Sequence, residues 1–278
     1  MNHQALLSLF QTGQEENMQL AEQLALATSS DLLEVLAPYQ VLLSTDLPSL
    51  EAYQALFKTA IYTANKKGLS HLPAQLKDLQ QLREVFLSDN HFKRVPPCLL
   101  EVSQLTQLHL QRNHIDQLPS TVSQWQQLLY LYLGGNKLQE LPDALGNVHT
   151  LCILDLARNQ LKALPTTIYH WNKLSHLYLS ANKLLYLPDE IGAWKAMEWL
   201  DLSYNNLHSL PESIGLLSNL QRLDLTSNPL EQLPESIGAL QQLKELIIHE
   251  VPLDNQEQDR LAALLPNTKI IVNFDYLY

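Results

Sequence analysis

The central part of this chain repeats itself with a period of 23 residues. Residues 105–127 read LTQLHLQRNHIDQLPSTVSQWQQ and residues 151–173 read LCILDLARNQLKALPTTIYHWNK, and both fit the template LxxLxLxxNxLxxLPxxIxxLxx. Seven such units fill residues 82–242. The template asparagine recurs at Asn90, Asn113, Asn136, Asn159, Asn182, Asn205 and Asn228, and the proline at Pro96, Pro119, Pro142, Pro165, Pro188, Pro211 and Pro234. A fixed step in several residue types at once indicates a chain built from stacked copies of one unit.

The physical chemistry of one unit predicts a short strand, a turn and a return segment. LxxLxL alternates apolar and variable residues, so its leucines point inward and its variable residues point outward. An Asn side chain can both donate and accept hydrogen bonds, so it suits a buried turn whose backbone groups lack partners. Proline stops the strand from continuing. Because one unit cannot bury its leucines alone, the units are expected to stack into a solenoid.

This pattern resembles the leucine-rich repeat family, in its 23-residue LP-type class of intracellular scaffold proteins and many bacterial proteins. The resemblance covers roughly residues 59–274. It implies an α/β fold, a right-handed β/α solenoid or horseshoe, with a parallel sheet on the concave face and short turns on the convex face. It leaves the function open, because one fold hosts many functions.

Three regions are expected along the chain. Residues 1–58 lack the repeat and have helical apolar spacing, with Asp31 and the pair Asp46 and Pro48 as helix starts. We expect an α-helical cap over the open end of the solenoid, with a docking module for another protein as the alternative. Residues 59–253 form the solenoid, with divergent first and last repeats, and residues 254–278 form a C-terminal cap whose final strand begins at Lys269.

Charge and cysteine usage narrow the classes of partner and compartment. The net charge of −11 argues against nucleic acid and against anionic membrane surfaces. No apolar run is long enough to span a membrane, and we expect no signal peptide, because the N-terminus has no basic region and only a short apolar run. Cys98 and Cys152 are two or more repeats apart, which is too far for a disulfide. Without a disulfide, a signal peptide or a membrane span, the chain is expected to be cytoplasmic.

The outward strand positions are the candidate binding residues. Strands in register place equal template positions in columns across the sheet, and six aromatic residues fall in these columns although alternation turns them away from the core. Exposed aromatic clusters mark interaction sites. The predicted partner-binding residues are Phe86, His109, Tyr130, Tyr132, Ile153, Asp155, His176, Tyr178, Trp199, Asp201, Tyr204 and Arg222. The alternative is that neighbouring rings stack on each other and stiffen the sheet.

Two charged features accompany these aromatic residues. Asp155, Asp201 and Asp224 flank them toward the C-terminal side, which favours a partner with a basic element. Arg112 and Arg158 flank the small residues Gly134 and Gly135, a notch that could hold a carboxylate or phosphate. Two solvated arginines are the competing interpretation.

Catalysis receives little support from the sequence. His109 and His176 lie three strands apart, about 15 Å, which is too far to share a metal. No Ser or Cys nucleophile is obviously placed to complete a triad with His176 and Asp155, although Cys152 lies within two strands of both. No metal spacing or cofactor motif is present in the sequence. We therefore expect a non-enzymatic, cofactor-free and monomeric scaffold that binds a protein or peptide. A self-associating homodimer is the alternative, and a Cys/His enzyme is a remote one.

Overall fold

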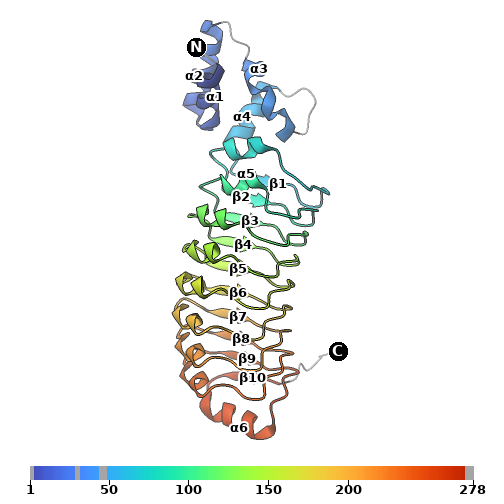
Figure 1. The fold of residues 1–278 in the computed structure, drawn as a ribbon. Coiled ribbons are helices and arrows are strands. Elements are labelled where there is room, and N and C mark those ends of the chain that lie inside the picture. The colour runs from blue at the N-terminus through green and yellow to red at the C-terminus, as the bar shows by residue number, and fades with distance from the viewer. Residues whose placement is uncertain (1–2, 29–31, 44–48, 273–278) are drawn as a thin grey trace, which may run out of the picture.

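A single parallel sheet runs the length of the solenoid. The computed structural model describes residues 3–28, 32–43 and 49–272. In this part of the chain ten strands follow one another in sequence order, each hydrogen-bonded to the next, along an elongated stack (Figure 1). The strands are β1 (Ile61–Thr63), β2 (Glu84–Phe86), β3 (Gln107–His109), β4 (Tyr130–Tyr132), β5 (Ile153–Asp155), β6 (His176–Tyr178), β7 (Trp199–Asp201), β8 (Arg222–Asp224), β9 (Glu245–Ile247) and β10 (Lys269–Ile271). The predicted α/β solenoid with one parallel sheet is confirmed.

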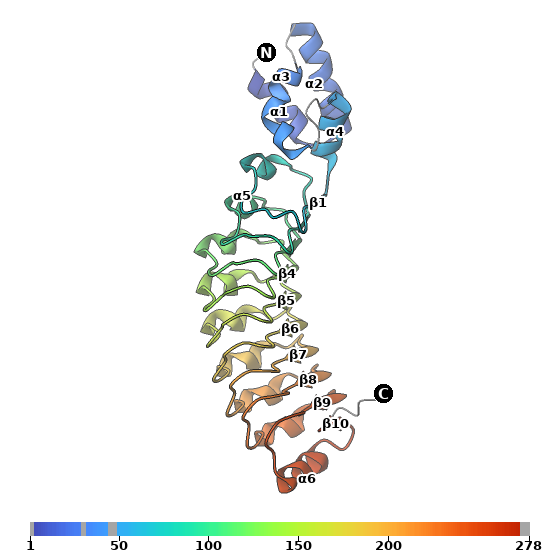
Figure 2. The same cartoon turned by 90° about the vertical axis from the view of Figure 1, so that its right-hand side faces the viewer.

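Short helices return the chain on the side opposite the sheet (Figure 2). Each begins directly after the template proline, which takes the N-cap position and ends the extended segment before the helix. They are η2 (Ala74–Asp78), α5 (Pro97–Leu100), η3 (Ser120–Gln124), η4 (Asp143–Asn147), η5 (Thr166–His170), η6 (Asp189–Ala193), η7 (Glu212–Leu216) and η8 (Glu235–Ala239). Leucines of the strands and apolar residues of these helices fill the space between, and most of them are fully buried.

The template asparagines bond the backbone of the buried turns, as predicted, and together they form a hydrogen-bonded ladder along the solenoid. Asn159 is 7% exposed; its Oδ1 accepts the Leu138 N–H at 3.0 Å, and its Nδ2 donates to the carbonyls of Leu133 and Leu156 at 3.1 and 3.0 Å. The other ladder asparagines repeat this arrangement one period apart. Backbone groups that the turn would leave unpaired are thereby satisfied inside the protein.

The residue just before each ladder asparagine has a left-handed backbone. Non-glycine residues adopt a φ between 50° and 59° at this position, and Gly135 adopts 72°. Before a ladder asparagine the non-glycine members are Asp89, Arg112, Arg158, Ala181, Tyr204 and Ser227, and Lys66 and Glu250 hold the same template position in the divergent first and last repeats, before Lys67 and Val251. This conformation costs a residue with a Cβ about 1–2 kcal/mol, so stacking and the ladder must hold it in place.

Three buried tryptophans link the repeats on the side of the short return helices. Trp125, Trp171 and Trp194 are fully buried, and their Nε1 atoms donate to main-chain carbonyls of the preceding return segment at 2.9, 3.2 and 2.9 Å. Three of the 4 tryptophans of the chain therefore serve the core, and Trp199 alone lies on the sheet. The column ties successive repeats together on the side where the short helices provide few backbone bonds between repeats.

Helices cover the N-terminal end of the solenoid. They are α1 (His3–Gln11), α2 (Glu15–Thr28), α3 (Leu32–Leu36), η1 (Ala37–Leu42) and α4 (Leu50–Lys58). Phe57 packs edge-on against Phe10 and Tyr39, and the Tyr39 hydroxyl donates to Asp78 in the first repeat at 2.7 Å. The predicted starts at Asp31 and at Asp46 and Pro48 lie outside the described residues; α4 is capped by Ser49, which accepts the Ala52 N–H.

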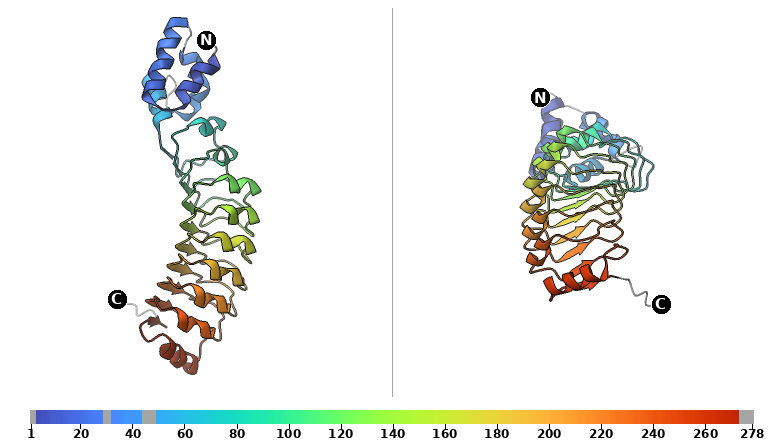
Figure 3. Two further views of the ribbon diagram at one scale, coloured as in Figure 1. Left: turned by 90° about the vertical axis from the view of Figure 1, so that its left-hand side faces the viewer. Right: turned by 60° about the horizontal axis from the view of Figure 1, so that its bottom comes forward.

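The C-terminal end is closed by α6 (Asn255–Leu264) and β10, as both views in Figure 3 show. Asp254 caps α6, as its position before the helix predicts. The Glu257 carboxylate accepts the Leu233 N–H at 2.8 Å and pairs with Arg260. An acidic side chain thus satisfies the backbone of the last full repeat. The final strand begins at Lys269 and ends at Ile271, and residues 273–278 lie outside the described part.

Candidate binding surface on the sheet

The outward columns of the sheet lie where the repeat places them. Tyr130 pairs with Ile153, Ile153 with His176, and His176 with Trp199. The fifth template position gives the second column, Phe86, His109, Tyr132, Asp155, Tyr178, Asp201 and Asp224. We call the outward side chains of these two columns, from β2 to β8, the concave face. All of them are half-buried, because neighbouring side chains shield one another.

The N-terminal half of the concave face carries a stack of three rings. The His109 ring lies between Phe86 and Tyr132, with ring centroids 4.5 and 4.3 Å away and interplanar angles of 23° and 20°. Burial within the stack lowers the pKa of His109, so the imidazole is neutral at pH 7. Stacking of neutral rings of this kind stiffens adjacent strands.

A second cluster occupies β6 to β9. Tyr178 meets Trp199 edge to face at 5.1 Å, and His176 lies beside Trp199 at 6.1 Å. The Arg222 guanidinium covers the Trp199 ring at 4.7 Å, and Arg222 Nε is 3.4 Å from the Glu245 carboxylate. The Trp199 indole N–H is buried and finds no acceptor among the described residues.

Asp155 separates the two ring clusters. Its carboxylate accepts the Ala157 N–H at 3.0 Å and lies directly against Gly134, where a Cβ would approach Asp155 Oδ2 to 2.7 Å. Burial raises the pKa of Asp155, with a further contribution from the negative charge of Asp201. The glycine therefore makes room for a carboxylate that the protein holds partly out of water.

Asp201 and Asp224 lie directly opposite each other on β7 and β8. Asp201 accepts from Ser203 N and Oγ at 3.0 and 2.6 Å, and Asp224 accepts the Thr226 N–H at 3.0 Å. Burial raises the pKa of Asp224 as well, and Asp201 adds to that rise. Like charges on facing positions of neighbouring strands repel each other, so this column favours an incoming cation.

Tyr204 lies at the edge of the concave face. It follows β7 with a left-handed backbone and is 57% exposed. The strand columns alone do not bring it into the ring clusters, and no ring contact involves it among the described residues.

The notch predicted at Gly134 and Gly135 is arranged differently. Arg112 pairs with Asp89 of the preceding repeat, with Nη2 2.8 Å from Oδ2, and the Asp155 carboxylate lies at Gly134. Arg158 is exposed. One arginine is thus neutralised and a carboxylate lies beside the glycine, so the arrangement does not favour a bound anion.

The residues considered for catalysis have structural contacts. His176 Nδ1 lies 2.9 Å from Ser175 Oγ, and the Cys152 thiol lies 3.5 Å from the Thr150 carbonyl. Cys98 and Cys152 are both free thiols, and burial raises the pKa of Cys98 to about 11. No group of three or more His, Cys, Asp or Glu side chains that could hold a metal occurs within residues 3–28, 32–43 and 49–272. In the same residues no helix has the length and apolarity needed to cross a membrane.

Comparison with protein families identifies the class of protein that these repeats define. The family described as Leucine rich repeat matches residues 103–161, 126–184, 172–230 and 195–250, which together span more than half of the chain. The chain therefore belongs to the leucine-rich repeat family. Members of this family act in general as protein-binding scaffolds and are typically non-catalytic. A comparison with curated proteins finds no match.

Solved structures with the same fold come from several sources. The crystal structure of PEPR1-AtPEP1 is 27% identical with a TM-score of 0.60, over 72% of this chain and 32% of that one. The functional domain of InlJ from Listeria monocytogenes is 19% identical with a TM-score of 0.62, over 78% and 49%. A TDR receptor is 20% identical with a TM-score of 0.62, over 82% and 46%. This chain spans less than half of the length of each of these proteins.

Proposed function

We propose that the protein is a rigid, non-catalytic scaffold that binds a protein or peptide through its concave face. The observation that carries the proposal is the juxtaposition of ring clusters with half-buried, mutually repelling carboxylates. Ring stacking by itself accounts for the aromatic residues as sheet stiffeners. It does not account for Asp201 facing Asp224, or for Asp155 held against Gly134 with a raised pKa. A partner that presents Lys or Arg beside an apolar side chain would pair with the carboxylates and also contact the ring clusters.

The Trp199 cluster is the expected anchor. An unpartnered buried N–H costs about 1–3 kcal/mol, and a partner that offers an acceptor after a small ring rotation would recover part of that cost. Tyr, Trp and Arg are the side chains that dominate binding energy at protein interfaces. Since the face is held by ladder and sheet hydrogen bonds, little conformational entropy is lost on binding.

The two free cysteines agree with a reducing compartment, and we propose the cytoplasm as the location. We also propose a monomer in the free state. Analytical size-exclusion chromatography with light scattering measures the mass directly. A dimer that dissociates when concave-face residues are changed would instead support self-association through this face.

The central test is a pull-down with paired variants. The intact protein, the Tyr178→Ala/Trp199→Ala variant and the control Tyr169→Ala are immobilised and exposed to native lysate. Tyr169 is 48% exposed on the return side, so its loss removes a comparable ring from another face. Circular dichroism melts confirm that the three proteins are folded alike.

We expect one or more proteins to be held by the intact protein and the control and lost by the double variant. Purified partner should then bind the Asp201→Asn/Asp224→Asn variant at least about tenfold more weakly if it supplies a basic element. Partners held equally by all variants would contradict the assignment to the concave face.

A further inference from the structure

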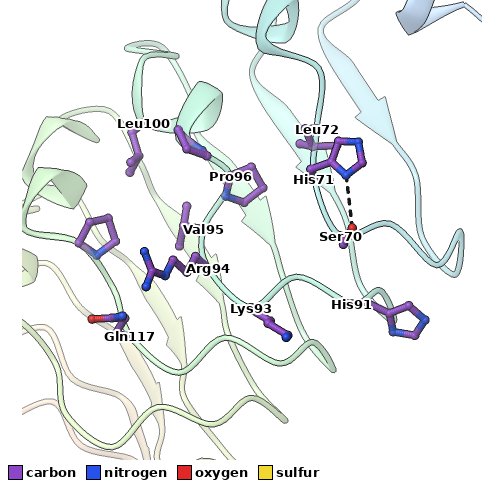
Figure 4. A pocket seen from close by; sticks show the side chains of 12 residues that line it. Ser70, His71, Leu72, His91, Lys93, Arg94, Val95, Pro96, Leu100 and Gln117 are labelled. Atoms are coloured by element: carbon purple, nitrogen blue, oxygen red, sulfur yellow. Dashed lines mark hydrogen bonds between the residues drawn. The ribbon is translucent and has the colours of Figure 1, made fainter.

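A hollow lies on the flank of the solenoid, and none of its lining residues belongs to the concave face. Its volume is about 680 Å³, and its walls come from α5 and from the segments between the ladder position and the return helix in the first three repeats. We call it the flank groove. It is lined by Ser70, His71, Leu72, His91, Lys93, Arg94, Val95, Pro96, Pro97, Leu100, Gln117 and Pro119. Figure 4 shows Arg94 and Gln117 on one side, Ser70 and His71 on the other, and Val95 and Pro96 between them.

The lining combines an apolar floor with a basic rim. Apolar side chains make the floor, while Lys93, Arg94, His71 and His91 stand around it. None of the lining residues is acidic, although the chain has 29 acidic and 18 basic residues. A local excess of cations in a protein with a net charge of −11 is therefore a property of this place and not of the surface as a whole.

The two cations of the rim are free to bind. Lys93 and Arg94 are exposed, and neither side chain forms an ion pair or hydrogen bond with another described residue. Asp116 is the neighbouring acid on the next repeat, and its backbone N–H donates to the Lys93 carbonyl, but its side chain does not line the groove. The positive charge thus remains available to a ligand.

The flank groove is not an automatic product of the repeat. The two positions held by Lys93 and Arg94 are occupied in the following repeats by Asp116–Gln117, Gln139–Glu140, Lys162–Ala163, Leu185–Tyr186, His208–Ser209 and Glu231–Gln232. None of these pairs carries two cations. This repeat also differs in having a second proline, Pro97, directly after the template proline Pro96, and an α-helical return segment, α5, where its neighbours have 3-10 helices.

The groove continues toward the helices at the N-terminal end. A neighbouring hollow of about 500 Å³ shares His71 and Leu72 with it and is bounded by Pro38 and Val41 of η1 and by Tyr62. Val41 is 61% exposed. The two hollows together make an elongated apolar depression with its cations at one end, which suits an extended chain better than a compact small molecule.

We propose that the flank groove binds a peptide segment of a partner protein that carries an acidic residue next to apolar side chains. The carboxylate pairs with Arg94 and Lys93, with Arg94 offering a planar fork of donors. The adjacent apolar side chain enters the floor formed by Leu72, Val95 and Pro96. This site is separate from the concave face and calls for the opposite charge in its ligand.

Selection from a random dodecapeptide library displayed on phage, with the full-length protein as bait, tests the proposal. Selected peptides are synthesised with a fluorescent label, and dissociation constants are measured by anisotropy. The test variant is Lys93→Glu/Arg94→Glu. The matched control is Lys162→Glu/Lys183→Glu, which makes the same change in net charge at two exposed lysines further along the solenoid.

We expect peptides enriched in Asp or Glu beside Leu, Phe or Trp. They should bind the test variant at least about tenfold more weakly than the intact protein, bind the control within about twofold, and weaken as NaCl is raised. Selection of no peptide, of peptides without acidic enrichment, or an equal loss in both double variants would overturn the proposal. So would peptides that lose affinity for Tyr178→Ala/Trp199→Ala and keep it for the test variant, because these bind the concave face.

Discussion

Replacing Asn159 by alanine tests the main hydrogen-bonded feature of the fold. Its Nδ2 shares the carbonyls of Leu133 and Leu156 with the ladder asparagines before and after it, so those two acceptors keep a partner when Asn159 is lost. The Leu138 N–H has no other acceptor among its recorded hydrogen bonds. One orphaned buried N–H costs about 1–3 kcal/mol and each of the two shared bonds about 0.5–1 kcal/mol, so we expect a loss of about 2–5 kcal/mol.

Urea and thermal unfolding followed by circular dichroism measure this loss. For a chain of this size the melting temperature should fall by about 5–10 °C. Asn172→Ala is the matched control, since Asn172 lies exposed in the same repeat, and it should stay within about 0.5 kcal/mol. A change at Asn159 no larger than at Asn172 would refute the ladder as a stabilising element.

Asn159→Asp adds a pH signature to the same experiment. Aspartate can still accept the Leu138 N–H, but it places a carboxylate against two carbonyl oxygens at a site that is 7% exposed. Its folded pKa should therefore lie above the unfolded value of about 3.9. Because the native state then holds the proton more tightly, stability relative to the wild type should fall as the pH rises from 4 to 8. A constant difference across this range would contradict the reasoning.

Three further predictions concern the concave face and the thiols. Gly134→Ala should destabilise the protein by about 1–2 kcal/mol, because the new Cβ displaces the Asp155 carboxylate, and the cost should shrink in an Asp155→Ala background, measured as a double-mutant cycle in urea. Asp155→Asn should be more stable than the wild type at pH 7, and the difference should vanish near pH 3. The pKa of Asp155 is higher in the folded than in the unfolded protein, so the wild type loses stability as the pH rises above the unfolded pKa. The Cys98 thiol, buried and with a pKa of about 11, should react with a disulfide reagent at pH 8 only after unfolding, whereas the half-exposed Cys152 should react in the native protein; fast labelling of both would contradict this burial.

The period of 23 residues was sufficient to predict most of the fold. Strand positions, their register and the role of the asparagines follow from alternation and from the need to pair buried backbone groups, and Asn159 is bonded as that argument requires. The sequence also placed Tyr178 and Trp199 on one surface, because parallel strands in register align equal positions. These features depend only on the course of the backbone, and the repeated sequence determines that course.

Side-chain pairing was not predictable in the same way. Arg112 lies against Gly135, as expected, but its guanidinium pairs with Asp89 one period back, and this partner was not foreseen. The flank groove was missed because its cations lie between the ladder and the LP step, outside the strand columns. The adjacent Lys93–Arg94 followed by a double proline is the signal that could have found it.

Because Asp155 lies between the two ring clusters of the concave face, the spacing of the strands sets the distance between the clusters. Tyr132 on β4 belongs to one ring cluster and Tyr178 on β6 to the other, so the two side chains are two strand spacings apart, about 10 Å. Solenoids change length by gaining or losing whole repeats, and one extra repeat between the clusters would move them apart by about 4.8 Å without altering any side chain. A partner whose two anchor residues fit both clusters would then no longer reach both at once. Ligand preference in this protein can therefore shift through repeat number as well as through point substitution.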